Sequence, residues 1–149
     1  MAMTGFLRAL TFLAIALAPL GCQAIDNPDA PNYLENFRSA ASSYERAVHE
    51  DAKTTSDSME AYREYIGFLE EELATVTSAL EGELSSSERE AFDEARNAWR
   101  TYQKMEKSFI STVWTPHNFG SSSAMSRLAF YADLLRSRVE LLQKYRMQF

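Results

Sequence analysis

The residues with the most useful chemistry in this chain are two histidines, His49 and His117, and one cysteine, Cys22. A di-iron helical bundle uses two Glu-x-x-His pairs and two further glutamates. Here Glu45 stands four residues before His49, and no second pair follows in the sequence. His117 follows Pro116 in a stretch of loop composition, where a solvated side chain is the ordinary expectation. The histidines therefore predict no metal site.

Other catalytic patterns are also missing from the sequence. A lone cysteine cannot supply the paired thiolates of structural zinc and iron–sulfur sites. There is no C-x-x-C-H haem motif and no glycine-rich phosphate loop. Ser121 to Ser123 near His117 match loop composition rather than a nucleophile with a base and an orienting acid. We therefore expect a non-enzymatic protein with no catalytic residues and no cofactor.

The first 24 residues have the pattern of a secretory signal peptide. Arg8 gives a positive start, and residues 9–20 form an apolar run. This run is too short to span a bilayer, which takes roughly 20 residues. A cleavage region of small residues follows at Gly21 to Ala24. The pattern predicts a cleaved signal over residues 1–24 and export to the periplasm or cell envelope.

Two processing routes are open at Cys22. Its position directly after Leu20 and Gly21 resembles a bacterial lipobox, in which the cysteine is lipidated and becomes the mature N-terminus. Pro19 stands where a lipobox normally has leucine. The alternative is ordinary cleavage after Ala24, which discards Cys22. We favour lipidation, which predicts a membrane-anchored lipoprotein with a polar tether over residues 25–31 and a folded domain over residues 32–149.

Apolar residues recur at three-four spacing in four segments of this domain, which is typical of amphipathic helices. The expected helices cover residues 32–52, 59–80, 84–114 and 123–146, with a polar break at 53–58 and a loop at 115–123. Gly82 is expected to stop the second helix. Either Ser85 with Glu88 or Ser87 with Glu90 would begin the third as a capping box. The predicted fold class is an all-α antiparallel bundle of about four helices; a coiled coil is the alternative, but the polar breaks favour a closed bundle.

The third segment carries an apolar row that contains several aromatic residues. The row predicts a buried seam, although an aromatic ligand platform is also possible, and consists of Phe92, Ala95, Trp99, Tyr102, Met105, Phe109 and Val113. Trp114 and Phe119, at the helix end and in the loop, are candidates for an exposed contact, because loops often carry recognition. Phe119 could instead close the end of the bundle.

Charge is distributed unevenly along the chain. Residues 57–94 hold twelve acids and only two bases, whereas residues 126–149 carry five bases and two acids. Solvated helix faces with attraction between helices would explain this, and so would a surface that docks a cationic protein. An acidic chain argues against nucleic acid as a partner. The candidate docking residues are Glu81, Glu83, Glu88, Glu90, Asp93 and Glu94, together with Trp114 and Phe119.

A short pattern in the second half resembles a known family. The sequence reads Ala98-Trp99-x-x-Tyr102, then Gly120-Ser121 in a loop, then a closing helix with Leu128, Tyr131 and Arg138. This is similar to the LprI-type lysozyme-inhibitor domain, which is found in bacterial envelope proteins. The resemblance runs from about residue 62 to 145. It departs from the family pattern at Gln103-Lys104, where the family has Arg-Asp, and in lacking the family cysteines.

The resemblance implies a small helical envelope protein whose family motif is Trp99, Tyr102, Gly120, Ser121 and Arg138. It also implies a protein partner such as lysozyme. Lysozymes are typically cationic, which suits the acidic surface that the charge count predicts independently. The interpretation is thus a lipid-anchored helical protein that binds a cationic cell-wall hydrolase through the second and third helices. The alternative is a structural or adaptor lipoprotein of the envelope that inhibits nothing.

Overall fold

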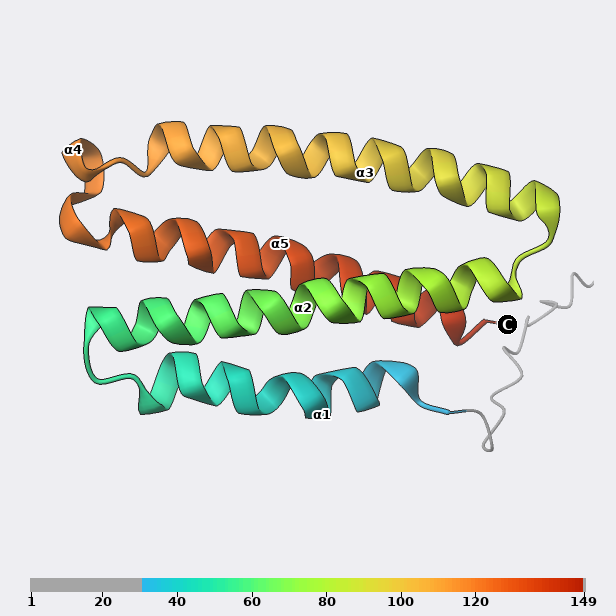
Figure 1. Cartoon of the computed structure of the whole chain (residues 1–149), viewed down its shortest axis with the longest axis horizontal. Helices are drawn as coiled ribbons and strands as arrows, with labels where there is room; N and C mark the ends of the chain where they lie inside the picture. The colour runs from blue at the N-terminus through green and yellow to red at the C-terminus, as the bar shows by residue number, and fades with distance from the viewer. Residues whose placement is uncertain (1–30, 149) are drawn as a thin grey trace, which may run out of the picture.

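Four long helices make up most of the part of the chain that this computed structural model describes, residues 31–148, and that part contains no strand. Successive long helices run antiparallel (Figure 1). The prediction of an all-α antiparallel bundle is therefore confirmed. The expected signal peptide, Cys22 and tether residues 25–30 lie outside the described residues. The elements are α1 (Tyr33–Arg46), the π-helical turn η1 (Ala47–Asp51), α2 (Thr55–Glu83), α3 (Ser86–Val113), α4 (Pro116–Phe119), the 3-10 turn η2 (Gly120–Ser122) and α5 (Ser123–Arg146).

Local capping residues set where the second and third helices begin. The hydroxyl of Thr54 accepts a hydrogen bond from the Asp57 backbone N–H, and the Asp57 carboxylate accepts one from the Thr54 N–H. This capping box starts α2 four residues before the expected Met59, so the polar break is shorter than predicted. Of the two candidate serines, Ser85 caps α3 and pairs with Glu88.

Two expected boundaries were wrong. Gly82 does not stop the second helix, which continues to Glu83, with Leu84 in extended conformation as its C-cap. The predicted loop 115–123 is largely helical, since it contains α4 and η2. Between these turns Gly120 has φ of +61°, a conformation that glycine adopts without the steric cost of a side chain.

The core lies between α1, α2 and α5. Each of these helices buries part of its predicted apolar row, because burial of apolar surface is the main favourable term in folding. Phe37 of α1 stacks against Phe68 of α2 with ring centroids 6.1 Å apart. The fully or nearly fully buried residues here are Phe37, Ala41, Val48, Tyr65, Leu69, Val76, Leu80, Ala132, Leu135, Val139 and Leu142.

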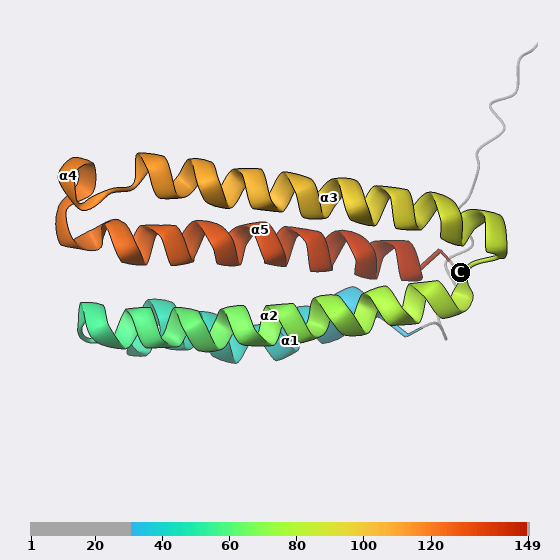
Figure 2. The ribbon, with the colours of Figure 1, turned by 45° about the horizontal axis from the view of Figure 1, so that its top comes forward.

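Helix α3 lies outside this three-helix core. Both views place it beside α5 and away from α1 (Figures 1 and 2), and only its half-buried Phe92 and Trp99 pack against the core residues. Ile110 is the only buried residue of α3. The predicted buried seam was wrong for four of its seven members, of which Tyr102, Met105 and Phe109 are 50%, 66% and 58% exposed. Ala95 is exposed too, while Phe92, Trp99 and Val113 are half-buried.

The side of α3 that faces α5 includes only part of the predicted row and is partly polar. Trp99 on this side lies under the guanidinium of Arg138, 5.4 Å from the ring centroid. The Gln103 amide donates to the Tyr131 hydroxyl at 3.2 Å. These contacts hold α3 on α5 by a mixture of polar and aromatic interactions, and Tyr102, Met105 and Phe109 are left facing solvent. None of the helices described here is long and apolar enough to cross a membrane.

Candidate functional site

The end of the bundle where α2 turns into α3 carries the acidic residues that the sequence singled out, and we call this region the acidic corner (Glu81, Glu83, Glu88, Glu90, Asp93 and Glu94). Three of its carboxylates are paired with arginines. Arg96 contacts Glu81 across the turn and Asp93 on its own helix, the latter at 2.7 Å. Arg146 of α5 lies 3.5 Å from Glu83. The predicted attraction between helices is therefore present, because arginines of α3 and α5 neutralise half of the corner.

The remaining acids of the corner are more available. Glu88 is exposed, and its pKa is lowered by hydrogen bonds from the Ser85 side chain and the Ser85 backbone. The Glu88 carboxylate therefore stays negatively charged at pH values at which an ordinary glutamate is already being protonated. Glu90 and Glu94 are exposed and take part in no ion pair within residues 31–148. These three residues give the first turns of α3 an unpaired negative surface.

A small apolar cleft opens beside this surface. It has a volume of about 190 Å³ and is enclosed by the end of α2, the start of α3 and the end of α5. Glu88 stands among the lining residues, so a carboxylate borders an otherwise hydrophobic hollow. Side-chain anchors in such pockets contribute most of the energy in many protein interfaces. The lining residues are Leu80, Leu84, Glu88, Phe92, Tyr145 and Gln148.

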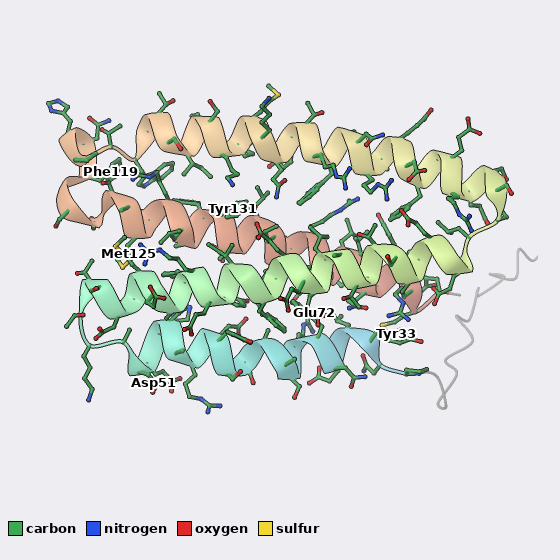
Figure 3. The ribbon with its side chains drawn as sticks, in the orientation of Figure 1. Tyr33, Asp51, Glu72, Phe119, Met125 and Tyr131 are labelled. Atoms are coloured by element: carbon green, nitrogen blue, oxygen red, sulfur yellow. The ribbon has the colours of Figure 1, made fainter. Side chains whose placement is uncertain are left out.

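Trp114 and Phe119, the aromatic members of the predicted docking set, lie at the other end of α3. Their rings stack 5.6 Å apart, and Phe130 of α5 lies 4.3 Å from Trp114. Figure 3 shows Phe119 at the end of the molecule opposite Tyr33, whose ring lies under Arg146. The 28 residues of α3 span roughly 42 Å at about 1.5 Å per residue. The predicted docking residues therefore form two separate groups rather than one surface.

An open groove runs between α3 and α5 on the side away from α2. It has a volume of about 480 Å³, and Trp99, Tyr102, Phe109 and Phe130 are among its lining residues. The rings of Tyr102, Phe109 and Phe130 are exposed here, so the groove presents an apolar surface that no helix covers. Exposed apolar patches of this kind often mark interaction sites. The sequence favoured a buried position for Trp99, Tyr102 and Phe109, with an aromatic ligand platform as the alternative, and did not single out Phe130.

The five residues of the family motif do not form one site. Trp99 and Arg138 are in contact, and burial lowers the pKa of Arg138. Tyr102 lies further along the same groove with its ring half exposed. Gly120 and Ser121 are in η2, at the end of the molecule near Phe119. The motif thus marks the α3–α5 contact and the turn between these helices.

The titratable residues considered for metal chemistry are dispersed. The Glu45 carboxylate lies 3.0 Å from Arg136 and accepts a hydrogen bond from the Tyr65 hydroxyl at 3.0 Å, whereas His49 is exposed at the edge of Tyr62. His117 is exposed in α4. Across residues 31–148 no three His, Cys, Asp or Glu side chains come close enough to hold a metal ion.

Sequence reasoning missed several residues that the structure brings to these sites. Leu84 and Tyr145 line the cleft at the acidic corner. Leu84 was expected to begin the third helix, and Tyr145 was expected only to widen the apolar row of the last one. Arg96 and Arg146 pair with acids from other helices, which no spacing rule could have indicated. Comparison with protein-family models, with curated proteins and with solved structures gives no match to this chain.

Proposed function

We propose that this chain is an exported, lipid-anchored helical binding protein that docks a cationic cell-wall hydrolase of the lysozyme type at its acidic corner. The observation that carries the proposal is the apolar cleft of Leu84, Phe92 and Tyr145 with the charged Glu88 at its edge. Such a cleft suits an apolar side chain of a partner whose surrounding surface is basic. The resemblance to lysozyme-inhibitor domains, which rests on Trp99-x-x-Tyr102, agrees with this proposal.

The electrostatic part of the proposal concerns the rate of association. Unpaired rim charges attract an oppositely charged partner over a distance and raise the association rate, and salt screens this attraction. Glu88, Glu90 and Glu94 would provide this attraction, and the cleft would provide the anchor. The groups that arginines neutralise, Glu81 and Asp93 among them, would contribute less.

The test is a cell-wall lysis assay with hen-type lysozyme and the purified full chain at low ionic strength, together with direct binding measured by surface plasmon resonance. We expect inhibition and binding that weaken as salt is raised. Glu90→Gln with Glu94→Gln should slow association severalfold. The matched control is Glu64→Gln with Glu71→Gln, two exposed acids of α2 away from the corner. Full lysozyme activity and no binding at low salt would refute the proposal.

The membrane anchor is tested separately, because residue 22 lies outside the described chain. Cys22→Ser should move the protein from the membrane fraction to the soluble fraction of the cell. Unchanged fractionation would contradict lipidation at Cys22 without bearing on the acidic corner.

A second candidate function is that of a structural or adaptor lipoprotein, and the exposed groove between α3 and α5 favours it. Tyr102, Met105 and Phe109 present a row of apolar side chains to solvent, which a scaffold could use to hold another envelope component. Under this alternative, Phe109→Ser would abolish association with that component and would leave lysozyme binding unchanged. The acidic-corner variants would show the reverse pattern.

A further inference from the structure

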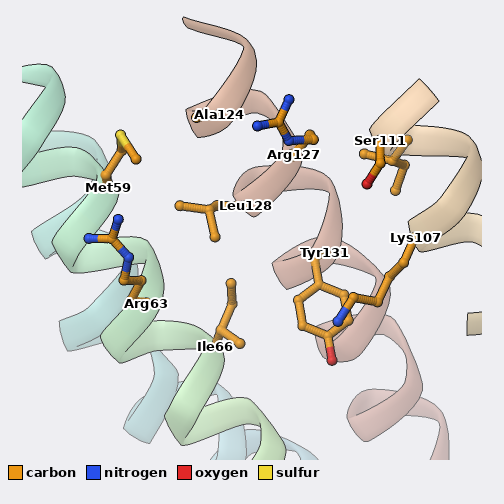
Figure 4. Close-up of a pocket in the computed structure, with 10 residues that line it drawn as sticks. Met59, Arg63, Ile66, Lys107, Ser111, Ala124, Arg127, Leu128 and Tyr131 are labelled. Atoms are coloured by element: carbon orange, nitrogen blue, oxygen red, sulfur yellow. The ribbon is translucent and has the colours of Figure 1, made fainter. Parts of the chain in front are cut away.

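A third cleft lies between α2, α3 and α5, on the side of α3 opposite the aromatic groove. It has a volume of about 430 Å³, within the roughly 300–1,000 Å³ of typical ligand pockets. In Figure 4, Ile66 of α2 and Leu128 of α5 point toward each other across the cleft, and the ring of Tyr131 lies along one side. Met59 and the buried Ile110 complete an apolar lining.

Three cations surround this apolar space, one from each helix. Arg63 comes from α2, Lys107 from α3 and Arg127 from α5. None of the residues that line the cleft is acidic. The chain as a whole carries a formal charge of −6, so this cleft reverses the overall sign of the protein. It is also opposite in sign to the acidic corner.

The contacts of these cations show how much of their charge is available. Arg63 is paired with Glu60 at 2.9 Å on the exposed side of α2. Lys107 lies over the face of Tyr131, with its Nζ 3.8 Å from the ring centroid. Arg127 donates a hydrogen bond to the backbone carbonyl oxygen of Trp114. Lys107 and Arg127 take part in no ion pair with any described carboxylate.

Two acidic residues near the cleft stand outside its lining: Glu60, which pairs with Arg63, and Glu70. The Tyr131 hydroxyl donates to Glu70 at 2.8 Å and accepts from Gln103, which keeps its ring oriented along the cleft wall. Burial and the hydrogen bond to Glu70 raise the pKa of Tyr131 to about 12, so the ring remains neutral. Ala124 and Arg127 lie in the first turns of α5, where the helix dipole favours a negative group.

From this arrangement we infer that the cleft between α2, α3 and α5 binds a free fatty acid, with its chain against Ile66, Leu128 and Tyr131 and its carboxylate at the cationic edge to which Lys107 and Arg127 contribute. An apolar lining with cations at its edge complements a molecule that is a hydrocarbon chain with one anionic end. A nucleotide or sugar phosphate would leave much of its polar surface against an apolar lining, which carries a desolvation cost. This inference does not depend on the proposed function, because it uses other residues.

The test uses the purified full chain and radiolabelled dodecanoate in equilibrium dialysis, below the concentration at which dodecanoate forms micelles. We expect saturable binding of one molecule per chain. Dodecanol has the same chain and no charge. It should bind about tenfold more weakly, because it cannot make the charge-assisted contact between a carboxylate and the cations of the cleft. Lysophosphatidylglycerol is the second competitor, and it should displace dodecanoate poorly.

Two variants locate the site. Lys107→Gln removes one cation, and Ser111→Trp fills the cleft from its exposed rim. Both should weaken dodecanoate binding about tenfold. The control is Lys104→Gln, an exposed lysine of α3 that does not line the cleft. Thermal unfolding of each variant shows whether the bundle is intact, and Lys107→Gln keeps the test valid if Ser111→Trp does not fold.

The inference is overturned if dodecanoate fails to bind saturably. It is also overturned if folded Lys107→Gln and Ser111→Trp bind as tightly as the unchanged chain, since the fatty acid would then occupy another part of the protein. Tighter binding of lysophosphatidylglycerol than of dodecanoate would overturn the assignment to a free carboxylate. Equal binding of dodecanol and dodecanoate would overturn the role of the cations.

Discussion

Phe109 and Ile110 are neighbours on α3 and lie in opposite environments: Phe109 is 58% exposed, while Ile110 is 7% exposed. Removing the Ile110 side chain should therefore leave a cavity, and Ile110→Ala should lower the free energy of unfolding by about 2–4 kcal/mol. Phe109→Ala should change it by only about 0.5 kcal/mol. Urea unfolding of the two variants measures the difference. A larger loss for Phe109→Ala would mean that α3 faces α5 with the row predicted from its sequence.

The pair also shows what the sequence can predict about this fold. Helices α2 and α5 each have one apolar row, and Leu69, Val76, Leu135 and Val139 within those rows are fully buried as predicted. Helix α3 has apolar residues on more than one side, since Ile110 and Phe109 are adjacent. Periodicity shows where apolar side chains lie on a helix. It does not show whether another helix covers them.

The sequence likewise predicts only part of the candidate site. Counting charges placed the acidic corner correctly at the end of α2 and the start of α3. The pairing of Arg96 with Glu81 depends on how two helices meet, and it has no signature in the sequence. The three cations of the fatty-acid cleft come from three separate helices, and only the folded chain brings Lys107 and Arg127 to the same space.

The buried Tyr65 hydroxyl donates to the Glu45 carboxylate at 3.0 Å and so joins α2 to α1. Tyr65→Phe removes this bond and should lower the free energy of unfolding by about 1.5 kcal/mol, as expected for a hydrogen bond to a charged group. Tyr44→Phe is the matched control. The Tyr44 ring stacks 6.1 Å from Tyr65, and its hydroxyl makes no hydrogen bond within residues 31–148. Equal losses in the two variants would show that the Glu45 contact contributes nothing specific.

Tyr131 makes the stability of the bundle depend on alkaline pH. Burial and the hydrogen bond to Glu70 raise its pKa from the usual 10.0 of a tyrosine to about 12 in the folded chain. Because the folded value is the higher one, the stabilisation is complete below about pH 10 and is lost as pH rises toward 12. The free energy of unfolding in urea should therefore fall between pH 9 and pH 11.5. Tyr131→Phe should make this fall in the free energy of unfolding shallower. Tyr102→Phe, which changes an exposed tyrosine, is the control, and its fall should be steeper than that of Tyr131→Phe.

Arg96 controls how much negative charge the acidic corner presents, because it contacts both Glu81 and Asp93. Arg96→Gln releases these two carboxylates and should lower the free energy of unfolding by about 1 kcal/mol. If a cationic lysozyme docks at this corner, the same variant should associate with it severalfold faster at low salt. Arg100→Gln, an exposed arginine one turn further along α3, makes the same change in net charge. Surface plasmon resonance at two salt concentrations measures the association rate of both variants. Faster association for Arg96→Gln alone supports docking at the corner. An equal increase for both variants would reflect net charge and would leave the corner without a specific role.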